Sequence, residues 1–256
     1  MGKVYLIGAG PGAVDLLTLR AARILAQADV VFHDALVEPE VIALAFRAQK
    51  IAVGKRCGRH ATAQAFINKR LVDAARKHEV VVRLKGGDPM LFGRAQEEID
   101  ALRASGVPFE VVPGVTAALA AAADLGVSLT RRGVARSVVL VTPREGANER
   151  KSNWAEALAH SDSAAIYMGA SEAATIAAAL LAQGRPRGLP VVVVENASLS
   201  RSRRWHTTLA ELPKLAAESF TGPVVLLLGE VFAASASSGR QPIPKTEPSS
   251  VKSRRA

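Results

Sequence analysis

Short aliphatic runs alternate with amphipathic stretches along most of this chain. Runs such as Val80–Val82 and Phe109–Val112 have the length and the β-branched character of buried parallel strands. Between such runs, apolar residues recur at helical spacing; Thr18 can cap one helix that extends to about Ala28, and Thr62 can open another. This alternation predicts an α/β protein in which helices cover both faces of a parallel sheet.

The alternation is interrupted after Pro113-Gly114 and then begins again. In the second half we expect four strands, with helical stretches at 171–182 and 208–217 between the later ones. The strands are Val138–Val141, Ala164–Met168, Val191–Glu195 and Val224–Leu228. The pattern therefore predicts two α/β domains, residues 1–114 and 115–235. A Ser-, Pro-, Lys- and Arg-rich tail follows at 236–256, and its composition predicts disorder.

Composition narrows the class of protein. Of the 256 residues, 49% are hydrophobic but only 4% are aromatic, so the core must be aliphatic and rich in alanine. Cys57 is the only cysteine, which excludes a disulfide within the chain and is typical of a reducing cytoplasm. The apolar run near the N-terminus is too short for a signal peptide. The alanine-rich segment 117–123 ends at Asp124, so we expect no membrane span.

The charge leaves two kinds of partner open. The net charge is +10, of which the tail supplies about four, and the basic remainder could attract nucleic acid or a polyanionic small molecule. The basic segment Arg201–Trp205 favours nucleic acid, but two tyrosines and two tryptophans are too few for a base-stacking surface. We therefore expect no nucleic-acid partner.

A glycine loop with an acid in it is the most informative local pattern. In VVVRLKGGDPMLFGR, a predicted strand runs into Gly86-Gly87-Asp88-Pro89, and a helix begins after Gly93. Loops of this kind present backbone N–H groups to a small ligand at the carboxyl edge of a sheet. Asp88 would repel a phosphate, so the ligand should carry hydroxyls or positive charge.

A second glycine loop, Gly8-x-Gly10-x-x-Ala13, satisfies a permissive dinucleotide fingerprint, and Asp34 stands where a ribose-binding acid would be. Two features oppose a dehydrogenase. Pro11 removes an N–H from the loop, and the helix begins near Thr18, too late for its positive end to face the loop.

The motifs, taken in order, resemble those of the uroporphyrinogen-III C-methyltransferases, which belong to the tetrapyrrole methylase family. These motifs are GAGPG, HDALV, VGKRCGRH, VVRLKGGDPMLFGR, VVPGVTAA, GVSLTRRG, IYMG, PVVVVENAS and GPVVLLLGEV. The resemblance covers about residues 3–232. It implies two α/β domains with S-adenosylmethionine in the cleft between them, in a homodimer that needs no metal. It also implies two successive methyl transfers to uroporphyrinogen III, giving precorrin-1 and then precorrin-2 on the route to sirohaem and cobalamin.

The resemblance also implies roles for individual residues. By this resemblance, Asp34 has the role of proton acceptor and Lys55 that of proton donor. The resemblance further implies that the cofactor is contacted by Pro11, Gly86, Gly87, Asp88, Leu91, Thr116, Ala117, Met168 and Ala197. Thr116 could also cap the helix that it begins.

The substrate is a polycarboxylate, for which arginine forks are suitable partners. The candidates are Lys55, Arg56, Arg59, His60, Arg131, Arg132 and Arg136. The chain departs from the family pattern at Arg131 and Arg144, where relatives often have histidine, and at Ala95-Gln96, where they have two glycines. It has no counterpart of the domain that some relatives carry for dehydrogenation and iron insertion, so we expect a stand-alone methylase.

Overall fold

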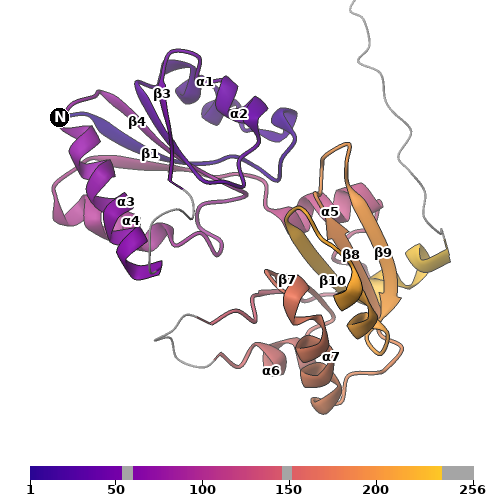
Figure 1. Cartoon of the computed structure of the whole chain (residues 1–256). Coiled ribbons are helices and arrows are strands. Elements are labelled where there is room, and N and C mark those ends of the chain that lie inside the picture. Colours follow the sequence, from indigo (N-terminus) through magenta and orange to yellow (C-terminus); the bar gives the residue numbers. More distant parts are fainter. Residues whose placement is uncertain (54–59, 146–151, 238–256) are drawn as a thin grey trace, which may run out of the picture.

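The computed structural model describes residues 1–53, 60–145 and 152–237, which form two five-stranded sheets with helices packed against them (Figure 1). The strands are β1 (Lys3–Gly8), β2 (Val30–His33), β3 (Gln49–Ala52), β4 (Val80–Lys85), β5 (Phe109–Val112), β6 (Val138–Val141), β7 (Ser163–Tyr167), β8 (Pro190–Glu195), β9 (Arg203–Thr208) and β10 (Val224–Gly229). The α-helices are α1 (Leu19–Gln27), α2 (Pro39–Ala43), α3 (His60–Ala75), α4 (Ala95–Ala104), α5 (Ala117–Leu125), α6 (Trp154–Ala159) and α7 (Ala173–Ala182). Short 3-10 helices lie at Val14–Leu16, Ala170–Glu172, Leu212–Ala217 and Glu230–Ser237.

The first sheet is entirely parallel, with the strand order β3-β2-β4-β1-β5. Neighbouring residues of β4 point to opposite faces: Val81 packs in the cluster that includes α3 and α4, and Val82 packs in the cluster that includes α1 and α2. Because both faces are buried, the first half of the strand, Val80–Val82, is a continuous apolar run instead of an alternating one. The predicted parallel sheet with helices on both faces is confirmed. All of its strands end at one edge, where the glycine loops begin.

The second sheet is mixed, with the order β6-β7-β10-β8-β9. Strands β6 and β7 are parallel, whereas β10 and β9 run antiparallel to their neighbours. Helices α6 and α7 cover one face, and α5 with Glu230–Ser237 covers the other. Alanines of α5 and α7 are buried in these clusters, so the core is aliphatic and alanine-rich as expected.

The helix expected at 208–217 is wrong over its first part. Thr208 is the last residue of edge strand β9 (Arg203–Thr208), which pairs with β8; residues 209–211 form a turn, and only Leu212–Ala217 forms a short 3-10 helix. The arginines of β9 conceal its strand character in the sequence, because an edge strand keeps polar side chains that a central strand excludes. This strand includes three of the residues considered above for nucleic-acid binding, Arg203, Arg204 and Trp205.

The predicted cap of α1 is confirmed, and α4 ends through similar local backbone chemistry. The hydroxyl of Thr18 accepts a hydrogen bond from the Ala21 N–H at 3.1 Å and caps α1. Helix α4 is followed by Gly106, whose φ of +65° ends the helix in the left-handed region. Within the described residues, none of the helices has the length and apolarity needed to cross a membrane.

Candidate functional site

The two glycine loops pair with each other across the edge of the first sheet. The Gly10 N–H donates to the Gly87 carbonyl at 3.2 Å, and the Gly87 N–H donates to the Gly10 carbonyl at 2.7 Å. Gly114, in the segment that connects the two sheets, packs directly against the Gly87 carbonyl. A Cβ at Gly114 would lie only 2.4 Å from that oxygen, so this position has room only for glycine. The Gly10 N–H that a dinucleotide pyrophosphate would need is therefore already bonded. The strand order also differs from the dinucleotide-binding order, with β4 between β1 and β2.

A cavity of about 760 Å³ opens beside these loops, between the carboxyl edge of the first sheet and the second sheet. That volume is typical of a small-molecule site. Residues from both halves of the chain line it, including Leu36, Arg144, Tyr167 and a wall at 218–225. Six of the residues expected to contact the cofactor are among them: Pro11, Gly86, Gly87, Ala117, Met168 and Ala197.

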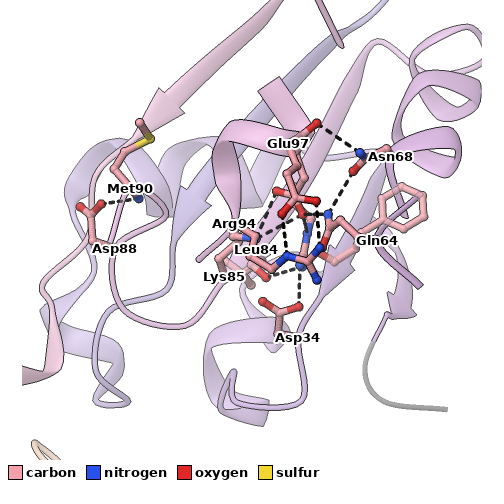
Figure 2. A network of polar contacts seen from close by, with 12 residues as sticks. Asp34, Gln64, Asn68, Leu84, Lys85, Asp88, Met90, Arg94 and Glu97 are labelled. Carbon is pink, nitrogen blue, oxygen red and sulfur yellow. Dashed lines mark hydrogen bonds and ion pairs between the residues drawn. The ribbon is translucent and has the colours of Figure 1, made fainter. Parts of the chain in front are cut away.

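Asp88 does not line the cavity but ties its loops together. One carboxylate oxygen accepts from the Met90 N–H at 2.8 Å, as Figure 2 shows, and the other accepts from the Gly114 N–H at 2.9 Å. The acid among the glycines thus joins the loop after β4 to the chain that leads into the second sheet. Leu91, half-buried in the same turn, donates its N–H to the Asp88 carbonyl at 3.3 Å and is also outside the lining.

Thr116 stands at the N-cap position of α5, but its side chain does not make the capping hydrogen bond that the sequence allowed as a second role. Its hydroxyl hydrogen-bonds instead to the hydroxyl of Tyr167 at 2.7 Å, and that same oxygen accepts from the Ala118 N–H at 3.1 Å. A tyrosine at the end of β7 therefore caps the helix from another element. Tyr167 also lines the cavity, and the centroid of its ring lies 5.2 Å from that of Phe92 in the loop before α4. Burial raises the pKa of Tyr167, although its two hydrogen bonds act in the opposite direction, so the hydroxyl stays protonated at neutral pH.

Of the two predicted catalytic residues, Asp34 belongs to the described part of the chain. Asp34 follows β2 and its side chain is 31% exposed; one oxygen accepts from Arg83 Nη2 at 2.5 Å. Leu36, two residues further on, lines the cavity. Lys55 lies outside the described residues, as do Arg56 and Arg59.

Of the other basic candidates, His60 begins α3, and Arg131, Arg132 and Arg136 are exposed in the second half without lining the cavity. Arg144, where relatives often have histidine, does line it.

Behind Asp34 lies a buried set of charges that sequence reasoning missed (Figure 2). Glu98 of α4 is fully buried and pairs with both Arg83 and Lys85 of β4 at 2.9 and 3.1 Å. Gln64 of α3 adds a hydrogen bond to Glu98 at 3.2 Å. The available signal was an arginine and a lysine inside an otherwise apolar strand, since buried charges occur almost only in pairs.

The pKa values of the two cations in this network shift in opposite directions. Burial opposes the charge of Arg83, but Glu98 and Asp34 outweigh it and raise the Arg83 pKa. Burial and the neighbouring Arg83 lower the pKa of Lys85, and Glu98 compensates only in part. The same buried carboxylate thus faces one cation whose pKa is raised and one whose pKa is lowered.

A second buried carboxylate holds the opposite wall of the cavity. Glu195, at the end of β8, accepts from the Thr221 and Gly222 N–H groups at 2.6 and 2.8 Å and pairs with Arg203 at 2.6 Å. Burial raises the pKa of Glu195, but the hydrogen bonds from Arg203 and the two amides outweigh this and lower it. The carboxylate stays ionised and fixes the segment around Gly222, which lines the cavity.

The cavity fits a nucleoside-sized cofactor such as the one that the resemblance implies. A Cβ at Gly87 would have no atom within 4 Å, and one at Gly86 would meet only the Leu36 Cβ at 3.4 Å, so these two backbone positions face open space. Ala117, Met168 and Ala197 provide apolar walls. Ala117 is also the first residue of α5, whose positive end favours an anionic group such as a carboxylate.

The sequence is similar to those of siroheme synthases over nearly the whole of this chain. The chain is 43% identical over 249 residues to a siroheme synthase of Nitrosococcus oceani, a match that covers 96% of this chain and 53% of the relative. It is 44% identical over 233 residues to a siroheme synthase of Tolumonas auensis, covering 91% of this chain and 50% of the relative. The chain thus spans about half the length of the curated relatives that it matches.

Solved structures match over their whole length. The native uroporphyrin III C-methyl transferase from Thermus thermophilus is 39% identical, with a TM-score of 0.80 over 94% of this chain and 98% of that one. The same enzyme complexed with S-adenyl homocysteine is 39% identical, with a TM-score of 0.79 over 91% and 100%. The family model of the tetrapyrrole (corrin/porphyrin) methylases matches residues 3–213, and the chain therefore belongs to the tetrapyrrole methylase family.

Proposed function

We propose that this protein is an S-adenosylmethionine-dependent C-methyltransferase. It converts uroporphyrinogen III into precorrin-2 by two successive methylations, through precorrin-1, for sirohaem or cobalamin biosynthesis. One observation carries the proposal: a cavity built from both glycine loops and from the ends of β7 and β8, in a chain that matches the whole of an S-adenyl homocysteine complex of a uroporphyrin-III C-methyl transferase.

The residues that line the cavity suit this cofactor, which supplies a methyl group on a cationic sulfonium. We assign its close backbone contacts to Pro11, Gly86 and Gly87, and its apolar walls to Ala117, Met168 and Ala197. Asp88, Leu91 and Thr116 support the same site from behind the lining, because Asp88 and Thr116 hydrogen-bond to the loops and strands that form it. The carboxylate of Asp88 also lowers the electrostatic cost of a cation nearby.

Methyl transfer is an in-line displacement, so the protein contributes mainly by positioning. An electron pair of the pyrrole forms the new C–C bond to the methyl carbon, the S–C bond breaks, and the macrocycle becomes cationic. A proton must then leave the macrocycle, and we assign its acceptance to Asp34, whose side chain is about one-third exposed two residues before Leu36 of the cavity lining. The proton-donor role of Lys55 rests on the resemblance.

The acceptor is a polycarboxylate, and we assign its recognition to arginines around the cleft. Arg144 lines the cavity directly. The basic residues near Lys55 and near Arg131 are further candidates, because guanidinium groups bind carboxylates bidentately. This accounts for the basic body of the chain without a nucleic-acid partner.

We extend the proposal to organisation and place in the cell. The units are residues 1–114 and 115–235, and the enzyme acts as a cytoplasmic homodimer, without a metal, a membrane or a nucleic acid as partner. A single cysteine supports the reducing compartment.

The direct test is anaerobic incubation with uroporphyrinogen III and S-adenosylmethionine, followed by mass spectrometry of the tetrapyrrole. We expect the addition of two methyl groups, with a monomethylated species at early times. A reaction without S-adenosylmethionine is the control. Recovery of unmodified tetrapyrrole from folded protein that binds S-adenosylhomocysteine would show that the acceptor is a different one.

A further inference from the structure

The carboxylate proposed to accept the proton is held from behind by a buried cation. Arg83 Nη2 lies 2.5 Å from Asp34 Oδ1, and the side chain of Arg83 is only 3% exposed. We infer that Arg83 is a positioning residue, which fixes the carboxylate of Asp34 at the edge of the cleft and affects the reaction only through Asp34. The inference rests on the proposed function, and within it on the assignment of Asp34.

The guanidinium of Arg83 is fixed by partners other than Asp34. Its Nε donates to Glu98 Oε1 at 2.9 Å, and its Nη1 donates to the Leu84 and Phe32 carbonyls at 3.2 and 3.5 Å. These contacts come from α4, β4 and β2, so they set the plane of the fork from three elements. Since the guanidinium is planar, they also fix the direction in which Nη2 points toward Asp34.

Asp34 depends on this contact for its orientation. Within the described part of the chain, Arg83 is the ion-pair partner that the structure gives to its carboxylate. The backbone of Asp34 is anchored separately, since its N–H donates to the Leu84 carbonyl and its carbonyl accepts from the Val37 N–H, both at 3.3 Å. Loss of Arg83 would therefore free the side chain of Asp34 without releasing the loop.

The rest of the network should survive the loss of Arg83. Glu98 would keep Lys85, at 3.1 and 3.2 Å from its two oxygens, and the amide of Gln64 at 3.2 Å. One buried anion would still face one buried cation, and Asp34 is exposed enough to be hydrated. Arg83→Met is therefore expected to fold, and Arg83→Lys, which keeps the charge, is a second variant for the same test.

The test is a double-mutant cycle of Arg83→Met and Asp34→Asn in the methylation of uroporphyrinogen III, with S-adenosylhomocysteine affinity measured by calorimetry. We expect each single variant to lower kcat by about 10- to 100-fold and to change cofactor affinity by less than about 2-fold. The double variant should be within about 2-fold of Asp34→Asn, because Arg83 has no effect left once its partner is changed. Arg83→Lys should be intermediate. Arg103→Met, an exposed arginine of α4 in an ion pair with Asp100, is the matched control and should match the wild type.

Losses that multiply in the double variant would overturn the inference, because they mean that Arg83 acts independently of Asp34. A parallel fall in cofactor affinity would also overturn it, because it indicates a general structural effect. A fully active Asp34→Asn would also overturn it while leaving the methyltransferase proposal intact. If the wild type transfers no methyl group to uroporphyrinogen III, the proposed function fails, and the inference fails with it.

Discussion

Replacing Glu98 with glutamine tests whether the buried charges behind the cleft stabilise the fold. The carboxylate of Glu98 is fully buried and faces Arg83 and Lys85, which are 3% and 4% exposed. Glutamine keeps the size of the side chain but removes the charge. Arg83 would still have Asp34, whereas Lys85 would lose the carboxylate that the structure places against it. A buried ammonium would then lack its counter-ion.

Breaking a buried ion pair by removing one partner costs about 3–5 kcal/mol. We expect the lower end, about 3 kcal/mol, because the amide oxygen still accepts a hydrogen bond and Asp34 still faces Arg83. The measurement is urea unfolding followed by circular dichroism. The matched control is Glu97→Gln in the same helix, since Glu97 is 49% exposed in its pair with Arg94 and should change stability by less than about 1 kcal/mol. Equal stability of the two variants would refute the reasoning.

Three further predictions concern the loops and the lysine. Gly87 has a φ of +66° and lines the cavity, so a side chain at this position would enter the cavity. Gly87→Val should therefore weaken S-adenosylhomocysteine binding by about tenfold or more in calorimetry, with an unchanged circular dichroism spectrum. Unchanged affinity would show that the loop does not belong to the binding site. Asp88→Asn cannot accept from both the Met90 and Gly114 N–H groups, and should lower the free energy of unfolding by about 1–2 kcal/mol in urea titration. A wild-type midpoint would show that this bridge does not stabilise the fold. Because the folded pKa of Lys85 is lowered from 10.5, the unfolded chain binds the proton more readily, and stability should rise as the pH increases from the lowered value toward 10.5. Lys85→Met should remove that part of the rise in unfolding titrations at neutral and alkaline pH, and identical slopes for both proteins would contradict the prediction.

Much of the architecture could be predicted from local patterns. The central strand β10 of the second sheet is a continuous apolar run, and β4 of the first sheet begins with one at Val80–Val82. Thr18 and Gly106 mark helix ends through backbone chemistry that acts within a few residues. Strand β9 was missed because its pairing with β8 outweighs the polar composition of Arg203–Thr208. The antiparallel course of β10 could not be read either, since strand direction depends on pairing between distant segments.

The candidate site was predicted unevenly for a related reason. Backbone-lined positions such as Gly86 and Gly87 carry a local signal, because only glycine leaves such space in front of a loop. Tyr167 carries none, and the one signal at Arg83, a cation within an apolar strand, does not name its partners. Their roles arise from partners more than 45 residues away in the sequence, at Thr116, Ala118 and Asp34. The motif order identified the family, but it did not distinguish the residues that line the cavity from those that hold its loops in place by hydrogen bonds.

The sequence by itself determined the class of fold, the glycine loops and the family, because apolar periodicity, turn chemistry and ordered motifs are properties of neighbouring residues. The tertiary structure alone decided what Asp88 does: its carboxylate joins two loops by accepting backbone N–H groups 2 and 26 residues away. It also decided that Arg83, Lys85 and Glu98 form one buried network behind Asp34. The physical reason is that buried charges are stable only when partners from different elements converge on them, and only the packing of β4 against α4 brings these partners together.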